Sequence, residues 1–200
     1  MRLTEMNRYT AHLSRYFQQE EGDCIVLHPR NHRKIHIDML LFKPSRELPF
    51  WKLSTMGAGD YKLPLTSSQR NEFLMFLPED TDLSQAETLT WFCDVLLTVA
   101  LYPMENHIAV RFGHSIVWGE QPGTDMVCAC LQLPSPVSDP GFFKCRLGPF
   151  KQVSCLQVVL LTRQETEELQ KLGPEKFLDV LYPAEGPGHF LCEKYRSHRF

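Results

Sequence analysis

The segment from residue 51 to residue 64, WKLSTMGAGDYKLP, sets two glycines beside an aspartate and a tyrosine. Gly57 and Gly59 could cradle a phosphate, seat a catalytic group or turn the chain. A dinucleotide-binding fingerprint needs a third glycine and a helix directly after it, and a P-loop needs a lysine followed by serine or threonine. Neither set is present, because polar residues and Pro64 follow the glycines. The pattern therefore favours a turn with positive φ at a glycine, capped by the side chain of Asp60.

The stretch HPRNHRKIH spaces His28, His32 and His36 at intervals of four residues. On a helix these side chains would share one face and could bind a metal ion. Pro29 follows the first histidine, however, residues 34–43 have strand character, and the basic residues of this stretch would repel a cation. No carboxylate set completes the group. We therefore expect a solvated basic turn here, with no stoichiometric zinc and no cofactor.

The chain has seven cysteines, and several of them lie in apolar runs such as MVCACLQL and QVSCLQVV. This usage is typical of a reducing compartment, so we expect free thiols and a cytoplasmic location. Cys128 and Cys130 alternate along a strand and lack a second pair at zinc-binding spacing. Cys93 could form a nucleophile pair with His107 or His114, as in a hydrolase. It falls in an apolar helix, however, where nothing evident lowers the pKa of its thiol.

Length and composition indicate one ordinary globular domain. The chain has 200 residues, of which 43% are hydrophobic and 22% charged, and its formal net charge is −3. These values exclude a disordered protein, and the chain lacks the net positive charge that is typical of proteins that bind nucleic acid or an anionic membrane. The N-terminal residues lack the apolar core of a signal peptide, and no apolar run approaches the roughly 20 residues of a membrane span.

Hydrophobic periodicity and capping patterns predict the elements that must position these residues. Helices are expected over residues 3–20, ended by Gly22; from a capping box at Ser84–Glu87 to Tyr102, ended by Pro103; from a capping box at Thr162–Glu165 to Gly173; and from Pro174 to residue 182. Strands are expected at residues 24–28, 34–43, 50–56, 71–78, 114–118, 125–133 and 151–162.

Helices and strands are partly segregated along the chain. We therefore expect an α+β fold with a mixed, mainly antiparallel sheet and helices packed on it. Residues 1–182 are expected to form this single domain. Residues 183–200 are rich in glycine, proline and charge, so we expect a loosely ordered C-terminal tail.

Four blocks of the sequence resemble, in the same order, the suppressor of fused domain family. They are HIDMLLFKPSRELPFWKLSTMGAGDYKLP, NEFLMFLPED, WFCDVLLTVALYPMENHIAVRFGHSIVWGEQP and LGPFKQVSCLQVVLLTRQETEELQKLGPEKFLDVLY. They are similar to an opening pair of strands with a turn, the next strand, a helix with its Glu-Asn turn and Gly-His loop, and the closing strand and helices. The resemblance spans residues 25 to 182, nearly the whole domain.

The resemblance implies a non-enzymatic protein-binding module with a suppressor of fused-like fold. Animal members hold a transcription factor in the cytoplasm, and short bacterial members are similar to immunity proteins that neutralise a toxin. We therefore expect a cytoplasmic, bacterial, immunity-type protein that occludes another protein such as a toxin domain, and that is a monomer or weak dimer. A Cys/His hydrolase and a structural assembly subunit are the alternatives.

The expected partner-binding residues lie in two loops that mix aromatic, basic and acidic side chains. Loops on a rigid scaffold carry function more often than strands do, and tryptophan, tyrosine and arginine dominate interface hot spots. In animal relatives the corresponding turn lies near a ligand that is clamped between this domain and a second one. The residues are Asp60, Tyr61, Glu105, His107, Arg111, His114 and Trp118. In the alternative interpretation Trp118 belongs to the core, Tyr61 caps a strand end, and the loop serves to position the next strand.

Overall fold

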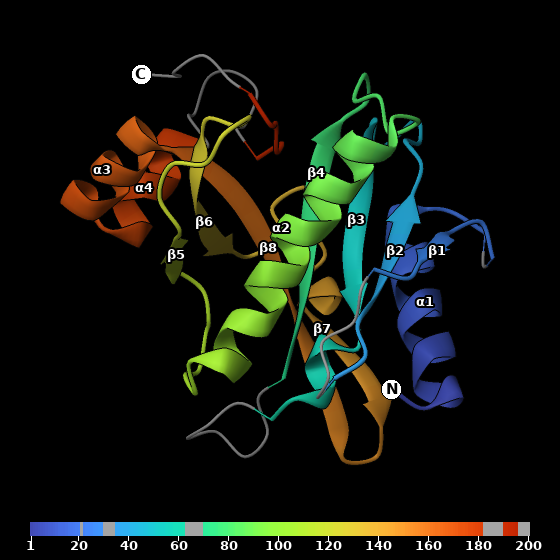
Figure 1. The fold of residues 1–200 in the computed structure, drawn as a ribbon. Coiled ribbons are helices and arrows are strands. Elements are labelled where there is room, and N and C mark those ends of the chain that lie inside the picture. The colour runs from blue at the N-terminus through green and yellow to red at the C-terminus, as the bar shows by residue number, and fades with distance from the viewer. Residues whose placement is uncertain (21, 30–34, 63–69, 182–189, 196–200) are drawn as a thin grey trace.

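The computed structural model describes residues 1–20, 22–29, 35–62, 70–181 and 190–195. The strands are β1 (Ile25–Leu27), β2 (Asp38–Phe42), β3 (Phe50–Met56), β4 (Asn71–Pro78), β5 (Ser115–Val117), β6 (Met126–Gln132), β7 (Lys144–Gly148) and β8 (Lys151–Thr162). They form one eight-stranded sheet in the order β1-β2-β3-β4-β8-β6-β5, with β7 paired to β8 off this path (Figure 1). The β4–β8 pair is parallel and the other described pairs are antiparallel. This confirms the expected α+β class.

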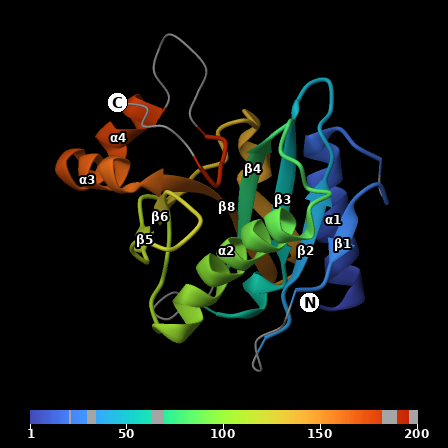
Figure 2. The ribbon, with the colours of Figure 1, turned by 45° about the horizontal axis from the view of Figure 1, so that its top comes forward.

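Helices cover both faces of the sheet (Figures 1 and 2). They are α1 (Leu3–Phe17), α2 (Ala86–Glu105), α3 (Arg163–Leu172) and α4 (Pro174–Leu181), with short 3-10 turns η1 (Ala58–Asp60) and η2 (Pro140–Phe143). Alternation along β2 separates the two faces, because Met39 and Leu41 pack in the core under α2 whereas Leu40 and Phe42 pack in the core under α1. A third apolar cluster joins α3 and α4 to β6 and β8.

Most of the expected elements are present, and one strand was missed. The expected ranges 50–56, 71–78 and 151–162 coincide with β3, β4 and β8. The missed strand β7 forms a hairpin with β8. Its sequence does alternate, with Cys145 and Leu147 buried and Lys144 and Arg146 exposed. This period-2 pattern was the available signal, but it is short and follows a proline-rich loop.

Two expected helix ends are wrong. The first helix ends at Phe17 rather than near Gly22, because Gln18 adopts a left-handed conformation with φ 55°. Pro103 lies inside α2, which continues to Glu105. A proline this close to the C-terminus removes one backbone hydrogen bond without ending the helix.

Of the two expected capping boxes, one forms. At Thr162 the hydroxyl accepts the backbone N–H of Glu165 (3.4 Å), and the Glu165 carboxylate accepts the backbone N–H of Thr162 (2.8 Å). Ser84 does not cap α2, since its hydroxyl donates to Asp82 (2.5 Å) and the helix begins at Ala86. A nearby carboxylate thus competes successfully for the serine.

The structure also describes part of the segment expected as a tail. Cys192 is fully buried, its backbone N–H donates to the carbonyl of Phe76 (2.7 Å), and its thiol lies 3.2 Å from the carbonyl oxygen of Val158. Residues 182–189 and 196–200 lie outside the described ranges. Among the described helices, none has the length and apolar character that a membrane crossing requires.

Candidate functional site

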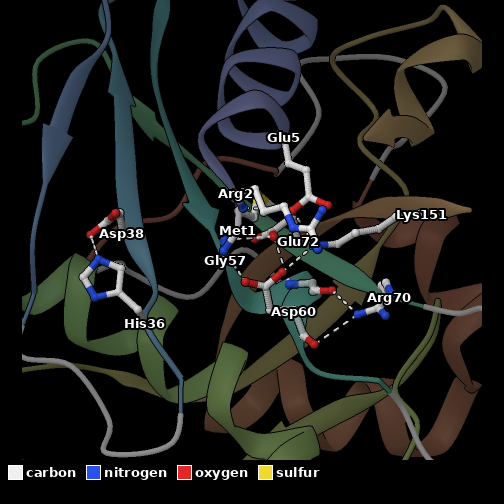
Figure 3. A network of polar contacts seen from close by, with 11 residues as sticks. Met1, Arg2, Glu5, His36, Asp38, Gly57, Asp60, Arg70, Glu72 and Lys151 are labelled. Carbon is white, nitrogen blue, oxygen red and sulfur yellow. Dashed lines mark hydrogen bonds and ion pairs between the residues drawn. The ribbon is translucent and has the colours of Figure 1, made fainter. Parts of the chain in front are cut away.

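The turn formed by residues 57–60, here called the glycine turn, is bonded to the side chain of a buried glutamate. Gly57 follows β3 with a φ of 121° and leads into η1. Glu72, on β4, is fully buried, and one of its carboxylate oxygens accepts the backbone N–H groups of Gly57 (3.0 Å) and Gly59 (2.9 Å). The other oxygen accepts the hydroxyl of Thr55 (2.6 Å). The turn is therefore satisfied by a side chain of the neighbouring strand (Figure 3).

Asp60 does not cap this turn, which corrects the expectation from sequence. Its carboxylate binds the ammonium of Lys151 (2.5 Å) and the amino group of Met1, and Lys151 also donates to Glu5 on α1 (2.9 Å; Figure 3). Partial burial opposes ionisation of Asp60, but the hydrogen bond and charge of Lys151 lower the pKa of this carboxyl below its ordinary value. Asp60 therefore fastens η1 to α1 and β8 through ion pairs.

Arg70 and Asn71 connect the glycine turn to the second predicted segment. The Arg70 guanidinium donates to the carbonyl oxygens of Gly59 (2.8 Å) and Asp60 (3.0 Å). The next side chain, Asn71, donates to the carbonyl oxygen of Val110 (2.8 Å) in the loop after α2. The tertiary structure thus brings the two predicted loops to the same end of the sheet.

The end of α2 and the loop between α2 and β5 carry exposed polar side chains. Glu105, His107 and Arg111 are exposed, and His107 has a left-handed backbone with φ 54°. His114 is half-buried, and its Nδ1 accepts the backbone N–H of Arg111 (2.9 Å). His114 therefore shapes the loop, while the three exposed residues face solvent.

β5 forms one edge of the sheet. In the described part of the chain it pairs with β6 and has no strand on its outer side. Within β5 the central residue, Ile116, is buried, whereas Ser115 is exposed and Val117 is 55% exposed. An edge strand presents backbone donors and acceptors that another strand can pair with.

Trp118 and Tyr61, two of the predicted partner-binding residues, are less exposed to solvent than Glu105, His107 and Arg111. Trp118 is half-buried, packs against the core under α2, and donates its indole N–H to the carbonyl of Met126 (3.0 Å). It lines a 210 Å³ hollow together with Trp91 of α2. Tyr61 is also half-buried, and its backbone N–H closes η1 on Ala58 (3.1 Å). The Trp118 side chain thus has structural contacts, and Tyr61 closes η1 through its backbone, where the sequence predicted a binding role for both residues.

Glu72, Arg70 and Lys151 are not among the site residues predicted from the sequence. Glu72 gave a signal, because it is a charge at the start of the apolar run NEFLMFLP. A buried charge inside a strand requires partners, and here these are backbone donors of the turn. The positions of Arg70 and Lys151 depend on strand order and gave no local signal.

The geometry does not favour the Cys/His hydrolase. Glu105 follows Cys93 by twelve positions along α2, about 18 Å of helix, and His107 comes only after this helix has ended. His114 is bonded to the backbone of Arg111. Burial, with a smaller effect from a neighbouring aspartate, raises the pKa of the Cys93 thiol to about 11, which disfavours a nucleophilic thiolate.

The model of the family described as Suppressor of fused protein (SUFU) matches residues 33–190. The chain belongs to the suppressor of fused family. A search of curated proteins found no match to this suppressor of fused chain.

Solved structures show the same fold. The Sufu-Fu complex crystal structure matches with a TM-score of 0.68 and 15% identity over 94% of this chain and 88% of that one. Drosophila Suppressor of Fused matches with a TM-score of 0.65 and 16% sequence identity, and the match covers 92% of this chain and 48% of the Drosophila chain. A putative SUFU homolog from Neisseria gonorrhoeae FA 1090 matches with a TM-score of 0.63 and 16% sequence identity, and the match covers 96% of each chain. This chain thus spans about half of the Drosophila chain and nearly all of the Neisseria one.

The buried Glu72 makes the stability of this suppressor of fused domain depend on pH. Burial raises the pKa of its carboxyl from 4.5 to about 7, although the bonds from Thr55, Gly59 and Gly57 act in the opposite direction. Between these values the folded state binds more protons than the unfolded state. The free energy of unfolding therefore falls as pH rises from about 4.5 to about 7, by about 3 kcal/mol from this group.

Urea unfolding of the wild type and of Glu72→Gln at pH 5 and pH 8 measures this effect. Glutamine keeps the shape of the side chain and has no charge to titrate. We therefore expect the free energy of unfolding of the variant, relative to that of the wild type, to be higher at pH 8 than at pH 5 by about 3 kcal/mol. A difference between the two proteins that is the same at both pH values would contradict the prediction.

Proposed function

We propose that this chain is a non-enzymatic protein-binding module whose partner pairs with the β5 edge and contacts the loop before it. The observation that carries the proposal is the edge position of β5, which has no strand paired to its outer side within the described ranges and which carries Val117, 55% exposed. Strand addition gives affinity through backbone hydrogen bonds and specificity through alternate side chains. The existence of a Sufu-Fu complex among the similar structures supports protein binding as the activity.

The side chains around β5 favour this edge over the opposite one. β1 also has exposed apolar residues, with Ile25 at 43% and Val26 at 42%. The loop before β5, however, adds the exposed Arg111, and the end of α2 adds the exposed Glu105. Arginine is enriched among interface hot spots, and a mixed polar rim is typical of protein interfaces.

The same substitution on the two edges tests the proposal. The partner is first identified by co-purification from the native cell at low salt. We expect Val117→Asp and Arg111→Ala each to weaken its binding by about 1–4 kcal/mol, measured by calorimetry, because one blocks the edge and the other removes a hot-spot side chain. Val26→Asp is the matched control. Loss of binding in Val26→Asp with unchanged binding in Val117→Asp would place the interface on the β1 edge instead.

We further propose that the partner is a toxin domain and that the chain acts as a cytoplasmic immunity protein by occluding it. The resemblance to short immunity-type members supports this choice. Co-expression of the identified partner with the wild-type chain should restore growth of cells that the partner alone arrests, and Val117→Asp should not. A partner that leaves growth unaffected would remove the toxin assignment while leaving the binding proposal intact.

A further inference from the structure

Three side chains that can bind a metal ion converge beside the β1–β2 edge. The antiparallel register pairs Leu27 with Met39, so His28, directly after β1, falls opposite Asp38. His36 precedes Asp38 by two residues, which places both on the same side of the extended chain. The backbone pairing therefore brings together residues that are ten positions apart.

Both imidazoles contact the same carboxylate oxygen. Nδ1 of His28 lies 2.7 Å and Nε2 of His36 lies 2.9 Å from Oδ1 of Asp38 (Figure 3 shows the second contact). The Asp38 side chain is 3% exposed, whereas the imidazoles are 67% and 61% exposed. The three candidate ligand atoms lie within 4.8 Å of one another. The cluster thus has a fixed, buried carboxylate and two movable rings on its solvent side.

We propose that His28, His36 and Asp38 bind one divalent transition-metal ion, with zinc as the preferred class. Zinc bonds imidazole nitrogen at about 2.0–2.1 Å and carboxylate oxygen at about 2.0–2.2 Å, so its tetrahedral ligands lie about 3.3 Å apart. Small rotations of the exposed rings reach this spacing. Imidazole ligands favour zinc, cobalt and nickel over calcium and magnesium. Three protein ligands leave a fourth position for water or for a group of a binding partner.

The backbone around the cluster is held in place by β3. Asp38 pairs with Met56 in the β2–β3 ladder. The next residue, Gly57, packs so closely on the carbonyl of His36 that a Cβ there would lie 2.4 Å from its oxygen. The backbone of two of the three ligand residues, His36 and Asp38, is therefore held in place before any ion binds, which reduces the ordering cost of binding.

The proposal departs from the expectation of no metal drawn from sequence. That expectation assumed that no carboxylate completes the histidine group, and it did not place Asp38 beside His28 and His36. The basic residues counted against a cation fall at 30–34, outside the described ranges, as does His32. The described part of the cluster holds two imidazoles and one carboxylate.

Metal titration of the chelator-treated protein tests the site. We expect calorimetry to show one Zn²⁺ per chain and Co²⁺ to give the visible absorption of tetrahedral coordination. Since loss of an outer-shell partner already weakens metal binding by about 10–100-fold, loss of a ligand in His28→Gln, His36→Gln or Asp38→Asn should weaken it by about 100-fold or more. Asp80→Asn, an exposed carboxylate after β4, is the matched control and should bind as the wild type does.

Thermal unfolding of the metal-free wild type and variants shows whether each variant is folded. The two histidine variants alter exposed side chains, so we expect their metal-free forms to unfold at the wild-type temperature, with added zinc raising the midpoint of the wild type alone. Absence of stoichiometric zinc in the wild type would overturn the proposal and leave a hydrogen-bonded His-Asp-His group. Unchanged zinc affinity in His28→Gln and His36→Gln would overturn it as well.

Discussion

Replacing Glu72 by alanine is expected to lower the free energy of unfolding by about 3–5 kcal/mol. The wild-type carboxylate accepts the backbone N–H groups of Gly57 and Gly59 and the hydroxyl of Thr55, inside a region without solvent access. Alanine removes the acceptor and leaves these donors buried. Each unsatisfied donor costs about 1–3 kcal/mol, and a cavity adds to the loss.

Chemical denaturation of Glu72→Ala and Glu79→Ala at pH 7 measures this effect. Glu79 follows the same strand and is exposed, so its removal should change stability by less than about 0.5 kcal/mol. Equal stabilities of the two variants would show that the turn does not depend on the carboxylate.

The second large effect is expected for Gly57→Ala, which should destabilise the domain by about 3–5 kcal/mol. The residue has a φ of 121°, which L-amino acids rarely adopt. The added Cβ would also lie 2.4 Å from the backbone carbonyl oxygen of His36. Because the Cβ is bonded directly to the backbone of residue 57, no side-chain rotation can relieve this contact. Relief would require separating the end of β3 from the segment before β2. The same movement would displace His36, so zinc affinity should fall along with stability.

Gly119→Ala separates the conformational term from the steric one. Gly119 also has a positive φ of 80°, but nothing lies within 4 Å of the position of its Cβ. We expect a loss of about 1–2 kcal/mol there, from backbone conformation alone. A loss in Gly57→Ala no larger than this, measured by urea unfolding, would mean that the contact with His36 relaxes easily.

Much of the fold could be predicted because its signals are local. The apolar runs at 50–56, 71–78 and 151–162 are long enough to identify β3, β4 and β8, and the Thr162–Glu165 box opens α3 within one turn. The misses have equally local reasons. β7 is short, Pro103 lies where a helix tolerates it, and Ser84 has Asp82 as a competing partner.

The candidate site was only partly predictable. The predicted residues Glu105, at the end of α2, and His107 and Arg111, in the loop after it, are exposed, because polar residues between a helix and an edge strand remain in solvent. Asp60 is different, since its ion pair with Lys151 joins residues 91 positions apart. Periodicity describes which face of an element is buried, and it contains no information about such distant pairs.

Local patterns in the sequence are sufficient to predict the presence of the helices and most strands, the bend at Gly57 and the absence of phosphate-binding motifs, since each depends on neighbouring residues. Which residues meet depends instead on the tertiary structure. Insertion of β8 between β4 and β6 leaves β5 at the edge, and the β3–β4 pairing carries Glu72 to the glycine turn. The β1–β2 register carries Asp38 to His28. These outcomes depend on strand order and register, which are selected by the packing of the whole sheet against its helices and not by any local segment.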